Sequence, residues 1–147
     1  MMSVDSGAAV LETEGNNPKA ADKKKTKFDV IIIGAGPSGY TAGIYCSRAG
    51  YDTLILSGVL PGGQLVNTTE VENFPGFENG IMGPDLMIDM RKQSQRMGTT
   101  IVDDEVVDVD FRRKPLKVLT ASEEYEGRAV IIATGANPRK IGLEGEE

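Results

Sequence analysis

The sequence predicts an α/β fold built around a parallel sheet. Two apolar runs rich in β-branched residues, at 28–33 and 128–133, have the continuous pattern of strands buried on both faces. Segments with helical spacing lie between these runs, and a glycine-rich turn joins the first run to the first of the segments. A strand, a helix and a second strand in this order form the β-α-β unit from which parallel sheets are built.

Length and charge limit the classes of protein that this sequence can represent. A chain of 147 residues has room for one domain with a modest core. The net charge of −6 argues against a nucleic-acid partner, because binding to phosphates requires clustered lysine and arginine. The sequence has no apolar run long enough to span a bilayer and no signal-peptide hydrophobic region, so we expect a cytoplasmic protein without a membrane partner.

The inventory of reactive side chains is small. Cys46 is the single cysteine, which excludes an internal disulfide, a Cys-x-x-Cys redox pair and a multi-cysteine metal site. The sequence has no histidine, the commonest zinc ligand and general base, so we expect neither a metal site nor a catalytic residue in this chain. Cys46 shares a helix face with Gly39, Ala42 and Ala49, which predicts a buried structural cysteine.

The first half of the chain divides into a tail and a β-α-β unit. Residues 1–27 show no strand or helix period, which predicts a disordered N-terminal tail, with order beginning at Phe28. After the strand at 28–33, a helix is predicted through Ala49, with Pro37 in its first turn and Gly50 at its C-terminal cap. A second strand follows at residues 51–56.

The second half begins with a long segment and ends with strands. Residues 57–82 lack a strong period, and their apolar and amide side chains predict an ordered loop that faces a ligand. Apolar residues at spacings of three and four then predict a helix at 83–97, closed by Gly98. A third buried strand is predicted at 99–102. An antiparallel meander is predicted with strands at 105–110 and 116–120, a turn at 112–115, and residues 123–126 leading out of it. A last buried strand is predicted at 128–133.

The glycine-rich turn indicates a dinucleotide site. Gly34, Gly36 and Gly39 have the GxGxxG spacing between a buried strand and a helix, as a tight turn beside a pyrophosphate requires. Its backbone amides and the helix N-terminus offer partial positive charge to a diphosphate. The second strand, which ends at Leu56, is followed by Ser57 and Gly58, where many such sites have an acidic residue for the ribose. Ser57 either bonds the ribose hydroxyl in its place or merely begins the loop.

A second motif carries a family resemblance. The run Gly62, Gly63, Gln64 and Leu65, followed by residues 68–77, resembles the flavin-contacting loop of low-molecular-weight thioredoxin reductases. The similarity continues through 83–84, 91–94, 98–101 and 131–136, so it covers about residues 28–143. It implies a Rossmann-like FAD/NAD(P)-binding fold with helices on one face of the sheet and the meander on the other, and an FAD-binding domain at 28–147.

The resemblance also implies which residues bind FAD. The residues expected to bind the pyrophosphate are Gly34, Gly36, Pro37, Ser38 and Gly39. Those expected along the ribose and flavin side are Ser57, Gly58, Gly62, Gly63, Gln64 and Leu65. Asn73 matches the contact to the flavin ring, although an asparagine before Phe74 and Pro75 also suits a plain turn. Val106 matches a backbone contact to adenine. Thr134 and Gly135 match a turn that passes close to the cofactor, the alternative being an ordinary turn at the end of a strand.

The sequence also departs from this family. The family's reaction passes a hydride from NADPH to FAD, and then electrons to a Cys-x-x-Cys disulfide and to thioredoxin. The sequence has one cysteine, no second glycine-rich turn for NADPH and no returning segment to finish the FAD domain, so we expect an incomplete domain with exposed apolar surface. A homodimer is possible because family members are dimers.

Three hypotheses follow from these departures. The preferred one is a truncated thioredoxin reductase that is inactive as an isolated chain. The second is a split or stand-alone flavin-binding module that acts with a separate partner. The third is a related ferredoxin-NADP reductase, against which the run at residues 72–76 argues because it is typical of the thioredoxin-reducing branch.

Overall fold

The computed structural model describes residues 25–137, 139 and 141–143. Most of the predicted disordered tail, residues 1–24, lies outside this part of the chain. The first strand begins at Lys27, directly before its predicted start at Phe28. In order, the elements are β1 (Lys27–Ile33), α1 (Pro37–Arg48), β2 (Thr53–Leu56), the 3-10 helix η1 (Gly63–Asn67), β3 (Glu70–Val71), β4 (Ile81–Met82), α2 (Gly83–Arg96), β5 (Thr100–Val102), β6 (Val106–Asp110), β7 (Leu116–Thr120) and β8 (Glu124–Ile132).

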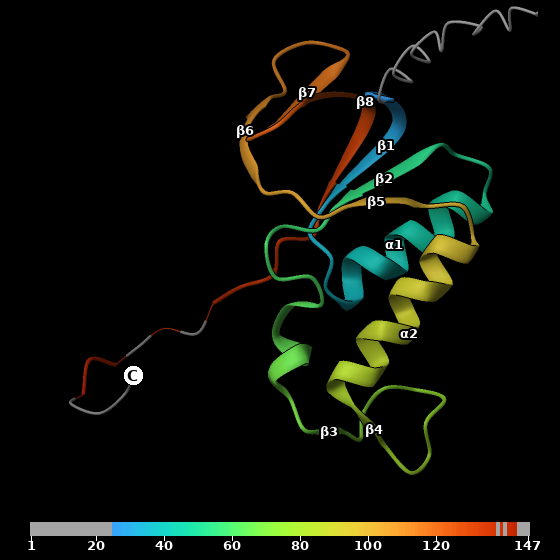
Figure 1. The fold of residues 1–147 in the computed structure, drawn as a ribbon, viewed down its shortest axis with the longest axis vertical. Helices are drawn as coiled ribbons and strands as arrows, with labels where there is room; N and C mark the ends of the chain where they lie inside the picture. The colour runs from blue at the N-terminus through green and yellow to red at the C-terminus, as the bar shows by residue number, and fades with distance from the viewer. Residues whose placement is uncertain (1–24, 138, 140, 144–147) are drawn as a thin grey trace, which may run out of the picture.

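The described residues form a six-stranded sheet in the order β5-β2-β1-β8-β7-β6, and β3 pairs with β4 in a separate two-stranded sheet. The pairs β1–β2, β1–β8 and β2–β5 are parallel, whereas β6–β7 and β7–β8 are antiparallel. Figure 1 shows α1 and α2 side by side against the parallel strands, with β6 and β7 at the opposite end of the molecule. The predicted α/β fold is confirmed.

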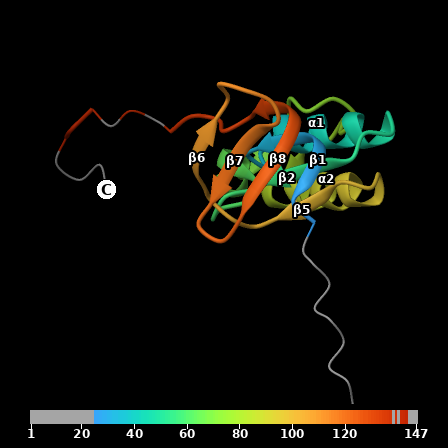
Figure 2. The ribbon, with the colours of Figure 1, turned by 90° about the horizontal axis from the view of Figure 1, so that it is seen from above.

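Two clusters of buried side chains define the two faces of the sheet. Ile32 and Ile55 pack against Leu86 of α2 on the helix face. Ile31 and Leu54 point to the other face, where Val118 of β7 packs with them. Neighbouring residues of one strand alternate between the clusters, as the pleat requires. The meander therefore covers the face opposite the helices, as predicted, and Figure 2 shows its strands continuing the sheet through β8.

The ends of both helices lie close to the predicted positions. Pro37 occupies the first turn of α1, and Gly50, with a φ of +87°, follows its C-terminal cap. Helix α2 ends at Arg96, and Gly98 adopts a φ of +101° beyond it. Since only glycine adopts positive φ readily, these two glycines mark where the helices stop.

Three predictions of local structure are wrong in part. The segment at 57–82 is no plain loop, because it contains η1 and the β3–β4 pair. The strand predicted as buried at 99–102 is β5, an edge strand whose residues are exposed or half-buried because it has a neighbour on one side only. The segments predicted at 123–126 and 128–133 fall largely in the single strand β8, which pairs with both β1 and β7. The part predicted as buried, 128–133, is exposed or half-buried throughout, and Ile132 at its end is exposed.

Candidate functional site

The carboxyl ends of the parallel strands meet at one edge of the sheet, beside a cavity of about 290 Å³. The glycine turn after β1 and the start of α1 contribute Gly34, Gly36, Pro37 and Ser38 to its lining. The segment beyond β2 contributes Ser57, Gly63, Gln64 and Leu65, and the segment beyond β8 contributes Thr134 and Gly135. Ligands of open α/β sheets bind at this edge, so the fold brings most of the predicted site residues to the expected place.

The three glycines of the turn have different steric roles. A Cβ at Gly34, whose φ is +108°, would lie 2.2 Å from the carbonyl oxygen of Ala133. A Cβ at Gly39 would lie 2.0 Å from the carbonyl oxygen of Gly34, which brings the helix close to the strand. A Cβ at Gly36 would meet nothing within 4 Å, so the backbone here borders open space. The turn is therefore tight on its protein side and accessible on its cavity side.

The N-terminus of α1 can interact with an anion. Gly36 is the N-cap and has no side chain to occupy the free amides of the first turn. The first turn also has no acidic residue that would repel an anion. The amides and the helix dipole together favour negative charge at this position, which is the mode by which helix N-termini bind phosphates.

Hydrogen bonds connect the segment beyond β2 to the glycine turn and to the chain beyond β8. The amide of Gly62 donates to the carbonyl of Ala35 at 2.9 Å. Gln64 Nε2 donates to the carbonyl of Ala136 at 3.4 Å and so connects this segment to the chain beyond β8. The cavity walls, which come from three parts of the sequence, are joined to one another by these hydrogen bonds.

Five predicted site residues lie outside this cavity. Gly39 and Gly62 have packing roles, since a Cβ at Gly62 would lie 2.4 Å from Val66 Cγ1. Gly58 adopts a φ of +73° and donates its amide to the carbonyl of Asp104 at 3.1 Å. Asn73 is exposed and lines a separate hollow of about 590 Å³ formed by residues 72–78. Val106 is half-buried at the start of β6 and packs against the core on the meander face.

Other residues at the cavity were not predicted. Ala35, Leu60 and Ala133 line it. Ala35 lies inside the GxGxxG motif and Ala133 directly precedes Thr134. Their position next to predicted site residues is the sequence signal that could have identified them as lining residues. Cys46 packs against the core on the helix face as predicted, but it is half-buried rather than buried because it lines a second cavity at the sheet's helix face.

A charged cluster near the cavity was also not predicted. Arg91 of α2 donates two hydrogen bonds to Asp103, from Nη1 at 2.9 Å and from Nη2 at 2.8 Å. The pKa of the Asp103 carboxyl is lowered, first by the hydrogen bond from Arg91 and then by that from Ser57, although partial burial acts in the opposite direction. Burial raises the pKa of the neighbouring Tyr40 hydroxyl. Asp103 is therefore held in its ionised form beside Ser57.

Two kinds of feature are absent from the described residues. No group of three or more His, Cys, Asp or Glu side chains in this part of the chain is arranged to hold a metal ion. No helix in it has the length and apolar character needed to cross a membrane.

The fold and the glycine turn define a Rossmann-like α/β domain, and comparison with known proteins gives the family. Residues 28–147 match the model of the pyridine nucleotide-disulphide oxidoreductase family. The chain therefore belongs to this family, as its resemblance to thioredoxin reductases predicted.

Thioredoxin reductases are among its relatives. The chain is 50% identical over 122 residues to thioredoxin reductase of Buchnera aphidicola, a match that covers 83% of this chain and 38% of the relative. It is 46% identical over 131 residues to thioredoxin reductase 2 of Arabidopsis thaliana, covering 86% of this chain and 34% of that protein. These curated relatives are thus much longer than the matched part.

Solved structures show the same similarity. The thioredoxin reductase from Giardia duodenalis superposes with a TM-score of 0.76 at 37% identity, covering 83% of this chain and 40% of that one. The Lactococcus lactis thioredoxin reductase gives a TM-score of 0.75 at 41% identity, covering 81% and 39%.

Proposed function

We propose that this chain is the FAD-binding portion of a thioredoxin-disulfide reductase that acts in the cytoplasm. The observation that carries the proposal is the cavity at the carboxyl edge of the parallel strands, bordered by the GxGxxG turn and the N-terminus of α1. Its residues fit a dinucleotide, because Gly36 leaves open space beside free amides and the first turn of α1 has no acidic side chain. The thioredoxin reductases among its relatives support FAD as the dinucleotide.

Each part of the lining would have its own task. The turn at Gly36 and the start of α1 at Ser38 would bind the diphosphate through backbone amides, and Gly34, whose amide donates to the carbonyl of Leu56 at 2.8 Å, would border it. Ser57 would contact the ribose, and Gln64 would lie on the flavin side. The remaining proposed contacts are those of Pro37, Gly39, Gly58, Gly62, Gly63, Leu65, Asn73, Val106, Thr134 and Gly135.

The chain would contribute only part of the proposed reaction. FAD, when bound, supplies a group that accepts a hydride, for which NADPH is the proposed donor. Thioredoxin is the proposed final acceptor of the electrons. A redox disulfide requires two cysteines, and Cys46 is the single cysteine of this sequence. The disulfide step would therefore use cysteines from outside these 147 residues.

A test of FAD retention addresses the proposal directly. The purified chain of 147 residues is mixed with FAD, separated from excess ligand, and examined by visible absorption. We expect retained absorbance with the resolved peaks of a protein-bound flavin. A folded but colourless protein would contradict FAD binding by this chain.

A matched pair of variants controls this experiment. Gly36→Val places two methyl groups in the open space beside the turn, where a Cβ meets no protein atom within 4 Å. We expect it to fold and to lose FAD. Ala121→Val makes a side chain of the same size at an exposed position between β7 and β8, and should retain FAD.

A further inference from the structure

The Ser57 hydroxyl has a restricted choice of hydrogen-bond partners. Ser57 is 6% exposed and lines the cavity. Its Oγ lies 2.6 Å from Oδ1 of Asp103, 3.1 Å from the carbonyl oxygen of Gly58 and 3.4 Å from that of Val102. A hydroxyl has one hydrogen to donate, and the carboxylate is both the nearest acceptor and the charged one. The hydrogen therefore points to Asp103, which leaves the lone pairs of Oγ to accept.

Asp103 cannot donate a hydrogen bond to Ser57 in return. An ionised carboxylate only accepts hydrogen bonds, and both of its oxygens receive bonds from Arg91. The Arg91 side chain is 27% exposed, and its two parallel hydrogen bonds fix the orientation of the carboxylate as well as its charge. The direction of the Ser57 hydrogen bond is thereby set by a residue of α2.

The three residues reach this position from neighbouring elements. Ser57 follows β2 and Asp103 follows β5, and the amide of Ser57 donates to the carbonyl of Val102 at 3.0 Å. Dinucleotide-binding folds commonly have an acidic residue at the end of the second strand, which accepts a hydrogen bond from the ribose. Here the carboxylate directly follows the adjacent strand, and it is hydrogen-bonded to a serine that lines the cavity.

We propose that Asp103, held by Arg91, is a positioning residue that fixes the Ser57 hydroxyl as a hydrogen-bond acceptor for a ribose hydroxyl of the bound dinucleotide. This inference rests on the proposed function and extends it to the choice of ligand. An acceptor at Ser57 suits a free ribose hydroxyl, which can donate. It disfavours a ribose that carries a phosphate, because a phosphate dianion has only acceptors to offer.

The test is a thermodynamic cycle on ligand affinity. FAD and ADP, which both carry an adenosine ribose, are titrated into the full chain and into Ser57→Ala, Asp103→Asn and the double variant. Each single variant should weaken the binding of both ligands by about tenfold, the usual effect of one hydrogen bond. The double variant should bind no more weakly than Ser57→Ala, since Asp103 acts only through Ser57. A merely structural role of Asp103 would make the two losses additive.

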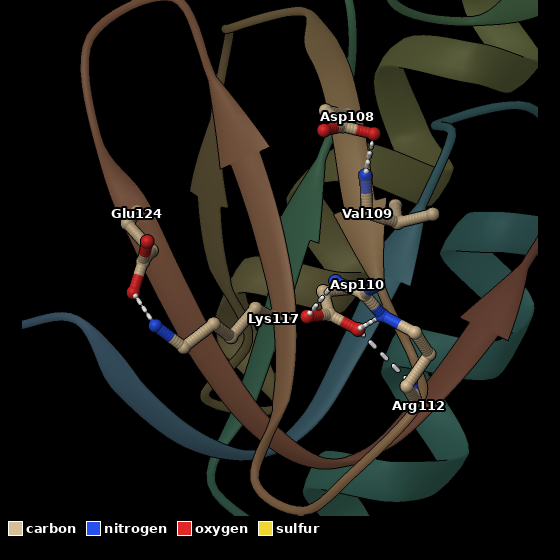
Figure 3. Close-up of polar contacts among 6 residues, drawn as sticks. All are labelled: Asp108, Val109, Asp110, Arg112, Lys117 and Glu124. Carbon is tan, nitrogen blue, oxygen red and sulfur yellow. Dashed lines mark hydrogen bonds and ion pairs between the residues drawn. The ribbon is translucent and has the colours of Figure 1, made fainter.

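The test includes one control variant and one substitute variant. Asp110→Asn breaks a similar aspartate–arginine pair in the meander, shown in Figure 3, and should leave both affinities unchanged. If Asp103→Asn does not fold, Arg91→Lys replaces it, and its smaller loss of affinity should vanish in the Ser57→Ala background.

The outcomes also separate this inference from the proposed function. FAD binding with unchanged affinity in the variants, or with additive losses, would overturn the inference and leave the proposed function standing. Binding of ADP without FAD, with the predicted cycle, would keep the inference and overturn the FAD assignment. A wild-type chain that binds neither ligand would overturn both.

Discussion

A Cβ atom at position 39 would lie 2.0 Å from the carbonyl oxygen of Gly34, so the first helix can approach the first strand only if residue 39 is glycine. Gly39→Ala must therefore displace backbone atoms, which have no rotamer to relieve the contact. We expect it to reduce the free energy of unfolding by about 2 to 3 kcal/mol, measured by urea denaturation.

Gly36→Ala is the matched control for this prediction. Its backbone has a φ of −80°, and an added Cβ meets nothing within 4 Å. The free energy of unfolding should change by no more than about 0.5 kcal/mol. Equal losses in the two variants would show that close packing of the helix on the strand is not what Gly39 provides.

The second prediction concerns the core on the meander face. Leu54 is fully buried in the middle of β2, among Ile31 and Val118. Leu54→Ala leaves a cavity there and should cost about 2 to 5 kcal/mol of stability in denaturant unfolding. Leu60→Ala makes the same chemical change at a side chain that is 77% exposed, so its effect should stay within about 0.5 kcal/mol. Similar losses at both positions would contradict the assigned core.

Two buried hydroxyls at the end of α2 should respond in opposite ways. Thr99 Oγ1 donates to the carbonyl of Gly43 at 3.1 Å and lies 2.8 Å from Ser47 Oγ. Thr99→Val keeps the shape but leaves the buried Gly43 carbonyl without this donor, so we expect a loss of about 1 to 3 kcal/mol in thermal or urea unfolding.

Ser94 provides the contrast. Its hydroxyl is fully buried and has no hydrogen-bond partner within the described residues. Ser94→Ala removes an unsatisfied polar group and should leave stability unchanged or raise it by up to about 1 kcal/mol. A substantial loss in Ser94→Ala would mean that its hydroxyl has a partner in solution.

The fourth prediction concerns the pH dependence of the meander. Arg112 donates to both oxygens of Asp110 from its side chain and to one from its backbone amide, as Figure 3 shows in part. These contacts lower the pKa of Asp110 from its ordinary value of 3.8 to about 2. Because the folded pKa is below the unfolded one, the stabilising contribution is complete above pH 3.8 and is lost as the pH falls toward 2.

Titration of the Asp110 carboxyl by NMR measures this shift. Arg112→Gln should raise the pKa of Asp110 most of the way to its ordinary value. Lys117→Gln removes the same charge from a residue whose side chain pairs with Glu124 at 2.6 Å, and it should raise the pKa only slightly. Equal effects would show that net charge, and not the hydrogen bonds from Arg112, depresses the pKa of Asp110.

Local patterns predicted the main elements of the fold well. The run at 28–33 and the helix beginning at Pro37 carry strong signals, because continuous β-branched residues and a following GxGxxG turn have few other structures open to them. The β3–β4 pair was missed because strands of two residues have no periodicity to detect. Gly127 falls between the segments predicted at 123–126 and 128–133, but in the structure it lies within β8, where its missing side chain leaves room for Ile31.

The parallel β-α-β unit, the glycine turn and the family resemblance can be recognised from the amino-acid order alone, because they depend on residues close together in the chain. The meeting of Asp103 and Arg91 beside Ser57 is visible only in the folded chain. Their contact requires β5 to pair with β2, which brings Asp103 to Ser57, and α2 to bring Arg91 within hydrogen-bond distance of Asp103. No local pattern specifies those neighbours. The direction of a hydrogen bond at the cavity therefore depends on long-range packing, whereas the glycine turn that borders the cavity follows from local sequence.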